Sequence, residues 1–135
     1  MGTFILVLLG DGVVAGNVLK NTKEEGTGWS SIVFGWGIAC TVAVYVAGLF
    51  SPAHLNPAVT IAMAATESLA WSKVLLYIVA QLLGAMFAAV ILWLHYYPHF
   101  KETKDSGAIL GMFSTAPAIR HTPSNFFGEA LGTAV

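Results

Sequence analysis

Charged side chains are scarce in this sequence. Lysine, arginine, aspartate and glutamate make up 10% of its 135 residues, whereas soluble domains average about 25%. Hydrophobic residues make up 56%, and one core of this size cannot bury them all, so lipid is the expected solvent. The net charge of −1 gives no basis for binding nucleic acid or an acidic partner.

Cysteine is scarcer still. The single cysteine, Cys40, excludes a disulfide framework and a thiolate metal site within the chain. Only His95 and His99 among the four histidines have helical spacing, and Pro98 is expected to end that helix, so we expect no metal site. The sequence implies no cofactor, and it shows no nucleophile–base pair, which argues against an enzyme.

Long apolar stretches are what the sequence has in abundance. Three of them approach or reach the ~20 residues that a spanning helix needs, and they cover residues 3–19, 30–50 and 74–97. Polar connections follow at 20–28 and 98–123, and a further span is expected to start at about 125–135, with Ser124 or Asn125 as its N-cap. We therefore expect a single membrane domain over 1–135.

Small residues recur at helical spacing in the second and third stretches. The positions are Gly35, Ala39, Ala43 and Ala47, followed by Gly84 and Ala88. Such stripes let helix backbones approach closely inside a bilayer. They predict tight helix–helix packing and are common to all multi-pass membrane proteins.

The segment "SPAHLNPAVTIAMAAT", residues 51–66, interrupts the apolar pattern. Asn56 is a favoured N-cap and Pro57 fits the first helical position, with Ala58 next, so a helix is expected over about 57–66. It would be roughly 15 Å long, about half of a ~30 Å hydrocarbon core. We expect it to start near the midplane and return to the side from which the chain entered.

The residues before this half-helix predict a polar lining. Backbone that leaves helical geometry inside a bilayer needs partners from protein or water. The expected acceptors are the carbonyl groups of Pro52, Ala53, His54 and Leu55, and the Asn56 amide would donate under the positive end of the helix dipole. Such a lining favours neutral hydrogen-bonding solutes and disfavours cations and protons. The alternative is an ordinary capped turn in a re-entrant segment.

The sequence resembles the major intrinsic protein family, the aquaporins and glycerol facilitators. The resemblance rests on "AHLNPAVTIA" at 53–62, with "WGIACTVAVYVAG" at 36–48 and "IVAQLLGAMFAA" at 78–89. It implies an all-α membrane protein with an aquaporin-like right-handed helical bundle. The chain would supply the first half, namely three spanning helices, one re-entrant half-helix and the start of the fourth span. We therefore expect a fragment, without the family's second Asn-Pro-Ala half-helix and the arginine that follows it.

The chain looks most like the glycerol facilitator branch. Trp36 precedes Asn56 by twenty residues, the spacing of the tryptophan that walls the constriction in that branch; packing is the alternative role for Trp36. By the same resemblance, the carbonyls of Pro52, Ala53 and His54 line the pore together with the Asn56 amide, although family members often have glycine at position 52. Cys40, one turn after Trp36, either lines the lumen or is a small buried hydrophobe.

Two polar side chains are expected to support the pore loops. The resemblance assigns Glu129 a structural role, accepting N–H groups from the re-entrant loop of its own half. Gln81 either bonds loop backbone or makes a simple interhelical hydrogen bond. Asp11 does not match the family pattern, and we expect it near the outer end of the first span, either hydrated or paired.

The function that follows is a passive transmembrane channel for glycerol and other small neutral solutes, with water as a further solute, excluding ions and protons. The alternatives are a water-selective aquaporin and, in another class, a secondary transporter with a broken helix, whose cycling acid would be Glu129. The resemblance implies a multi-pass plasma-membrane homotetramer in contact with lipid. Lysine and arginine counts put loops 20–28 and 98–123 in the cytoplasm, but the resemblance puts them outside, and we follow the resemblance.

Overall fold

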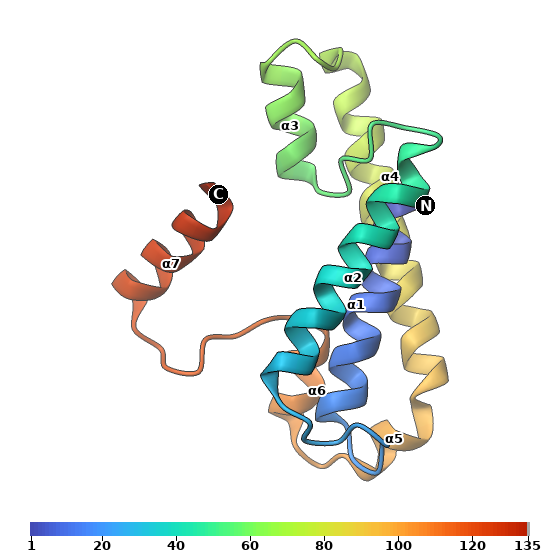
Figure 1. The fold of residues 1–135 in the computed structure, drawn as a ribbon, viewed down its shortest axis with the longest axis vertical. Coiled ribbons are helices and arrows are strands. Elements are labelled where there is room, and N and C mark those ends of the chain that lie inside the picture. Colours follow the sequence, from blue (N-terminus) through green and yellow to red (C-terminus); the bar gives the residue numbers. More distant parts are fainter. Residues whose placement is uncertain (135) are drawn as a thin grey trace.

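A computed structural model describes residues 1–134, which contain seven helices and no strand (Figure 1). In chain order these are α1 (Gly2–Val18), α2 (Trp29–Gly48), α3 (Pro57–Ala65), α4 (Trp71–His95), α5 (Tyr97–Glu102), α6 (Ser106–Phe113) and α7 (Thr122–Ala134). The helix α1 lies between α2 and α4 and contacts both, while α7 stands apart from the bundle (Figure 1).

Two helices are long and apolar enough to cross a membrane, judged by length and composition. They are α2, with 20 residues, and α4, with 25; α1 is apolar but shorter, with 17. Large hydrophobic side chains such as Phe34, Tyr45 and Leu75 are exposed on α2 and α4. Because water penalises such surfaces, this exposure agrees with a lipid environment.

The predicted stripes of small residues lie at helix contacts. Ala39, Ala43 and Ala47 are buried on α2, and Ala88 is buried on α4. At Gly84 the approach is so close that an added Cβ would lie 3.3 Å from the backbone nitrogen of Phe4 in α1. The small side chains thus set the spacing of the three long helices, as the sequence predicted.

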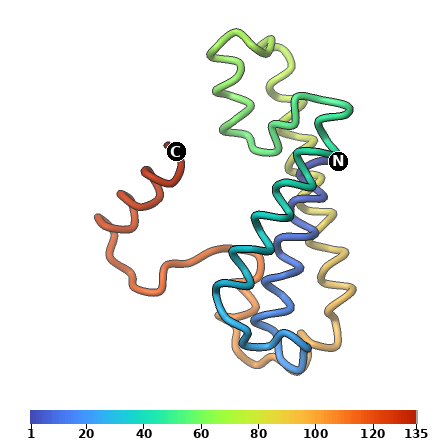
Figure 2. The backbone as a smooth tube through the Cα atoms, viewed as in Figure 1, coloured from blue at the N-terminus to red at the C-terminus, as the bar shows by residue number. Residues whose placement is uncertain are grey.

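The helix α3 has half the length of a spanning helix. It runs over residues 57–65, against a prediction of about 57–66, and its nine residues make it about 13 Å long. The backbone trace shows α3 beginning partway along α4 and running back toward the end where α4 starts (Figure 2). Ala64, Leu69 and Val74 bury the contact between α3, its following turn and α4.

The connection at 98–123 is more ordered than the sequence analysis expected. The helix α4 ends at His95, three residues before Pro98, as the sequence predicted. Pro98 itself lies in the first turn of a further short helix, α5, where its missing N–H group costs nothing. Asp105 starts α6 by accepting from the N–H groups of Gly107 and Ala108 at 2.8 and 3.3 Å. Met112 of α6 is buried against α1.

The helix α7 starts earlier than the sequence predicted. The helix begins at Thr122, and neither Ser124 nor Asn125 is its N-cap. Pro123 falls in the first turn, the helical position that proline tolerates best. The side chain of Asn125 instead donates to the carbonyl of Ile119 at 3.1 Å.

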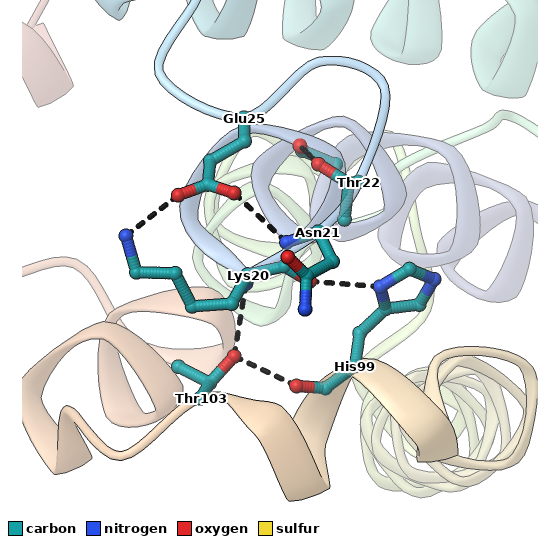
Figure 3. A network of polar contacts seen from close by, with 7 residues as sticks. Lys20, Asn21, Thr22, Glu25, His99 and Thr103 are labelled. Carbon is teal, nitrogen blue, oxygen red and sulfur yellow. Dashed lines mark hydrogen bonds and ion pairs between the residues drawn. The ribbon is translucent and has the colours of Figure 1, made fainter.

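A polar network ties the 20–28 loop to α5 (Figure 3). The Lys20 N–H group donates to Thr103 Oγ1 at 2.9 Å, and His99 Nδ1 donates to the Lys20 carbonyl at 2.8 Å. Glu25 accepts from Lys20 Nζ at 2.6 Å and from the N–H group of Asn21 at 2.8 Å. These hydrogen bonds lower the pKa of Glu25, that from Lys20 most, and the same bond raises the pKa of Lys20.

Candidate pore-lining site

The backbone before α3 is strained at two residues. Ala53 has φ 51° and Leu55 has φ 55°, in the left-handed region that residues with a Cβ rarely occupy. Each such residue costs about 1–2 kcal/mol. Left-handed residues flanking His54 break any helical path, so this segment leaves carbonyl groups without helical partners.

The four carbonyls that the sequence predicted as acceptors differ in whether they already accept a hydrogen bond. The His54 carbonyl accepts from the Asn56 N–H group at 2.6 Å, and the Leu55 carbonyl accepts from Thr3 Oγ1 at 3.0 Å. Within residues 1–134, the carbonyls of Pro52 and Ala53 accept no hydrogen bond. Two of the four expected acceptors therefore remain available to a solute.

Asn56 caps α3 as the sequence predicted. Its Oδ1 accepts from the N–H group of Ala58 at 2.8 Å, and Pro57 occupies the first turn. The residue itself has extended geometry and is exposed. Oδ1 is held by the cap, and within residues 1–134 the side-chain NH2 group of this exposed residue makes no hydrogen bond, so it remains a donor beside the positive end of the helix dipole.

A buried polar cluster anchors α3 to α4. Thr60, fully buried, donates through Oγ1 to the Asn56 carbonyl at 3.1 Å and accepts from Gln81 Nε2 at 2.9 Å. His54 Nδ1 lies 3.2 Å from the same oxygen, and its ring packs against Tyr77 with centroids 5.3 Å apart. His54 Nε2 and Gln81 Oε1 are buried without a partner among the described residues.

This cluster decides between the two roles that the sequence left open for Gln81. Within residues 1–134 its amide donates to a side chain of α3 and bonds no loop backbone, so the interhelical hydrogen bond is the arrangement observed. Sequence reasoning missed Thr60 and Thr3 as participants. Thr60 carried a signal, since it is the one hydroxyl inside an apolar half-helix and stands four residues after the N-cap.

Trp36 lies against α1 at a position where only glycine fits. A Cβ on Gly10 would come within 2.6 Å of the indole ring. The ring is half-buried and borders a hollow of about 980 Å³ between α1, α2 and α6. Cys40 is exposed rather than buried. Asn56 is not among the described residues that line this hollow, so the predicted site residues fall into two groups.

The remaining candidate, Glu129, is not brought to either group. It is exposed on α7, away from the re-entrant segment. Among the described residues no side chain bonds its carboxylate. The same part of the chain holds no group of three or more side chains suited to a metal ion.

Comparisons with known proteins find relatives over the whole length of the chain. A family model described as "Major intrinsic protein" matches residues 1–135. Glycerol uptake facilitator protein 3 of Lactiplantibacillus plantarum is 51% identical over the whole chain, which covers 56% of that protein. The glycerol uptake facilitator proteins of Streptococcus pneumoniae strain R6 and Bacillus subtilis are 54% and 48% identical, again over the whole chain, with 58% and 49% of their own lengths covered.

The chain therefore spans about half the length of these curated relatives. No solved structure matches it.

Proposed function

This chain belongs to the major intrinsic protein family, and we propose that it is the first part of a passive channel for glycerol and similar small neutral solutes, with water as a further solute. The whole channel would be a multi-pass plasma-membrane protein, a homotetramer in contact with lipid. The names of the relatives support the solute, since they are glycerol uptake facilitator proteins, and the chain covers 56% and 58% of two of them.

The observation that carries the proposal is the interrupted backbone at 51–56. It offers the free carbonyls of Pro52 and Ala53 as acceptors and the Asn56 amide as a donor. A solute with hydroxyl groups can use both, because a hydroxyl donates a hydrogen bond to a carbonyl and accepts one from the amide. A cation would meet the positive end of α3, which disfavours its passage. No covalent step is involved, so the activity is not enzymatic.

Trp36 supports glycerol over water as the solute. A flat indole offers an apolar face to the carbon backbone of a polyol while the hydroxyls bond elsewhere. The runner-up, a water-selective channel, has no use for this apolar face. Cys40 is exposed one turn further along α2 and would extend the same wall.

Light scattering in a stopped-flow instrument tests the proposal on vesicles that hold the complete channel. Glycerol should enter much faster than in empty vesicles, and its flux should not respond to pH or sodium gradients. Flux that follows either gradient would favour a secondary transporter. Fast water flux with glycerol at the background rate would favour the water-selective alternative.

Trp36→Ala tests the role of the indole. Loss of an aromatic contact of about 1 kcal/mol should raise the permeability of sorbitol relative to glycerol about fivefold. Trp71→Ala is the matched control, because Trp71 is exposed at the start of α4. An unchanged ratio in Trp36→Ala would remove this residue from the selectivity filter.

A further inference from the structure

The hollow beside Trp36 holds one feature that the proposed function does not use. Its walls come from one face of α1, the first half of α2, and α6 with the residues that follow it. Most of the lining is apolar, including Trp29 and Trp36. Ser114 and Thr115 add hydroxyl groups at its rim, and Asp11 adds a carboxylate from α1.

Asp11 is the only ionisable side chain of α1. It is half-buried, and within residues 1–134 it makes no hydrogen bond and no ion pair; the one salt bridge there joins Lys20 to Glu25. The fully buried side-chain atoms that lack a hydrogen bond belong to His54 and Gln81 and not to Asp11. The carboxylate oxygens of Asp11 are therefore accessible, and Asp11 lines the hollow. An unpaired carboxylate in an apolar helix costs free energy and therefore indicates a functional role.

The chemistry of the hollow identifies that use. A carboxylate only accepts hydrogen bonds, and its two oxygens can accept from two hydroxyl groups of one molecule. Bonds to an ionised acceptor are stronger than neutral ones. Trp36 supplies the apolar surface on which the carbon backbone of the same molecule can lie. An anionic solute would be repelled here.

We propose that Asp11 and Trp36 together form a polyol-binding vestibule, in which Asp11 is a further specificity-determining residue. This inference rests on the proposed function. The carboxylate accepts from neighbouring hydroxyls of the polyol before the molecule reaches the interrupted backbone at 51–56. It favours polyols over water, which lacks a carbon backbone for the indole, and over small organic anions.

The experiment compares Asp11→Asn and Asp11→Glu with the parent in vesicles that hold the complete channel. The probes are glycerol, water and lactate at neutral pH. Asp11→Asn keeps the shape of the side chain but loses the charge. We expect its half-saturating glycerol concentration to rise about three- to tenfold, with water permeability unchanged and lactate entry increased. Asp11→Glu should restore most of the preference for glycerol.

Glu102→Gln is the matched control, because it makes the same chemical change on an exposed residue of α5 outside the hollow. The inference is overturned if Asp11→Asn keeps the parent's glycerol saturation, if glycerol and water permeability fall in proportion, or if Asp11→Glu behaves like Asp11→Asn. Parent vesicles that pass no glycerol would instead overturn the proposed function, so the two failures are distinguishable.

Discussion

Thr60 of α3 and Thr103, the C-cap of α5, make the same pattern of hydrogen bonds. Figure 1 shows α3 and α5 at opposite ends of the helical bundle. Each hydroxyl donates to the carbonyl four residues earlier, that of Asn56 or of His99. Each also accepts from a donor far along the chain, and in both cases the distance is 2.9 Å. Both threonines are buried, with exposed fractions of 0% and 4%.

The difference lies in the donors. Thr60 accepts from the side chain of Gln81, which is itself buried and already has an unpartnered oxygen. Thr103 accepts from the backbone of Lys20, an exposed residue in a polar loop. Water can replace a lost partner more readily at exposed Lys20 than at Gln81, which is only 7% exposed. The same bond therefore stabilises the fold more at the half-helix than at the loop end.

Thr60→Val is expected to have the largest effect. It keeps the shape of the side chain but leaves buried Gln81 Nε2 and His54 Nδ1 without their shared partner, which should lower the free energy of unfolding by about 2–4 kcal/mol. Thr103→Val should lower it by only about 1 kcal/mol, because water can hydrate Lys20. Unfolding of the complete channel in mixed detergent micelles measures both. Equal losses would show that burial does not separate the two ends.

The double variant Thr60→Val with Gln81→Met sharpens the comparison. Replacing both partners of a buried hydrogen bond by apolar groups is often nearly neutral, so the double variant should recover the part of the loss that comes from Gln81, while His54 Nδ1 stays without its partner. A double-mutant cycle measures this coupling, expected at about 1–2 kcal/mol. Gln81→Met combined with Thr103→Val is the control, and its effects should add. Additive losses in the first pair would mean that Gln81 finds another partner.

At the end of the bundle that holds α3, most of the local structure was predictable from the sequence. Asn56 and Pro57 have strong positional preferences for the N-cap and the first turn, so they predicted the start of α3 locally. The left-handed geometry of Ala53 and Leu55 was not readable, because residues with a Cβ carry no signal for it. The pairing of Thr60 with Gln81 depends on how α3 and α4 are aligned, which no local pattern specifies.

At the other end of the bundle, around the 20–28 loop and α5, the sequence predicted less of the structure, for a different reason. Pro98 correctly predicted the end of α4, which stops at His95. Proline occurs both after helices and in their first turns, so Pro98 alone could not show that α5 begins at Tyr97. Asp105 is a favoured N-cap residue, so the start of α6 was predictable from the sequence. Glu129 was assigned by resemblance to support a re-entrant loop of its own half, and that assignment stays a prediction.

Glu25→Gln is expected to have the smallest effect, because Glu25 and Lys20 are exposed and water screens their attraction. The hydrogen bonds from Lys20 and Asn21 lower the pKa of Glu25 below its ordinary value of 4.5. Its contribution to stability is thus present above pH 4.5 and is lost as the pH falls through the lowered pKa. Lys20, with its raised pKa, contributes below its ordinary value of 10.5 and loses that contribution only at higher pH.

The N–H group of Asn21 reports this directly, since it donates to Glu25 Oε2 at 2.8 Å. At pH 7, Glu25→Gln should speed hydrogen exchange at Asn21 about two- to fivefold relative to the parent. The ratio between variant and parent should shrink toward one as the pH falls below 4.5, and 0.5 M salt should reduce it at pH 7. A ratio that stays constant from pH 7 to pH 3 would contradict this prediction. It would show that the charge of Glu25 does not order the loop.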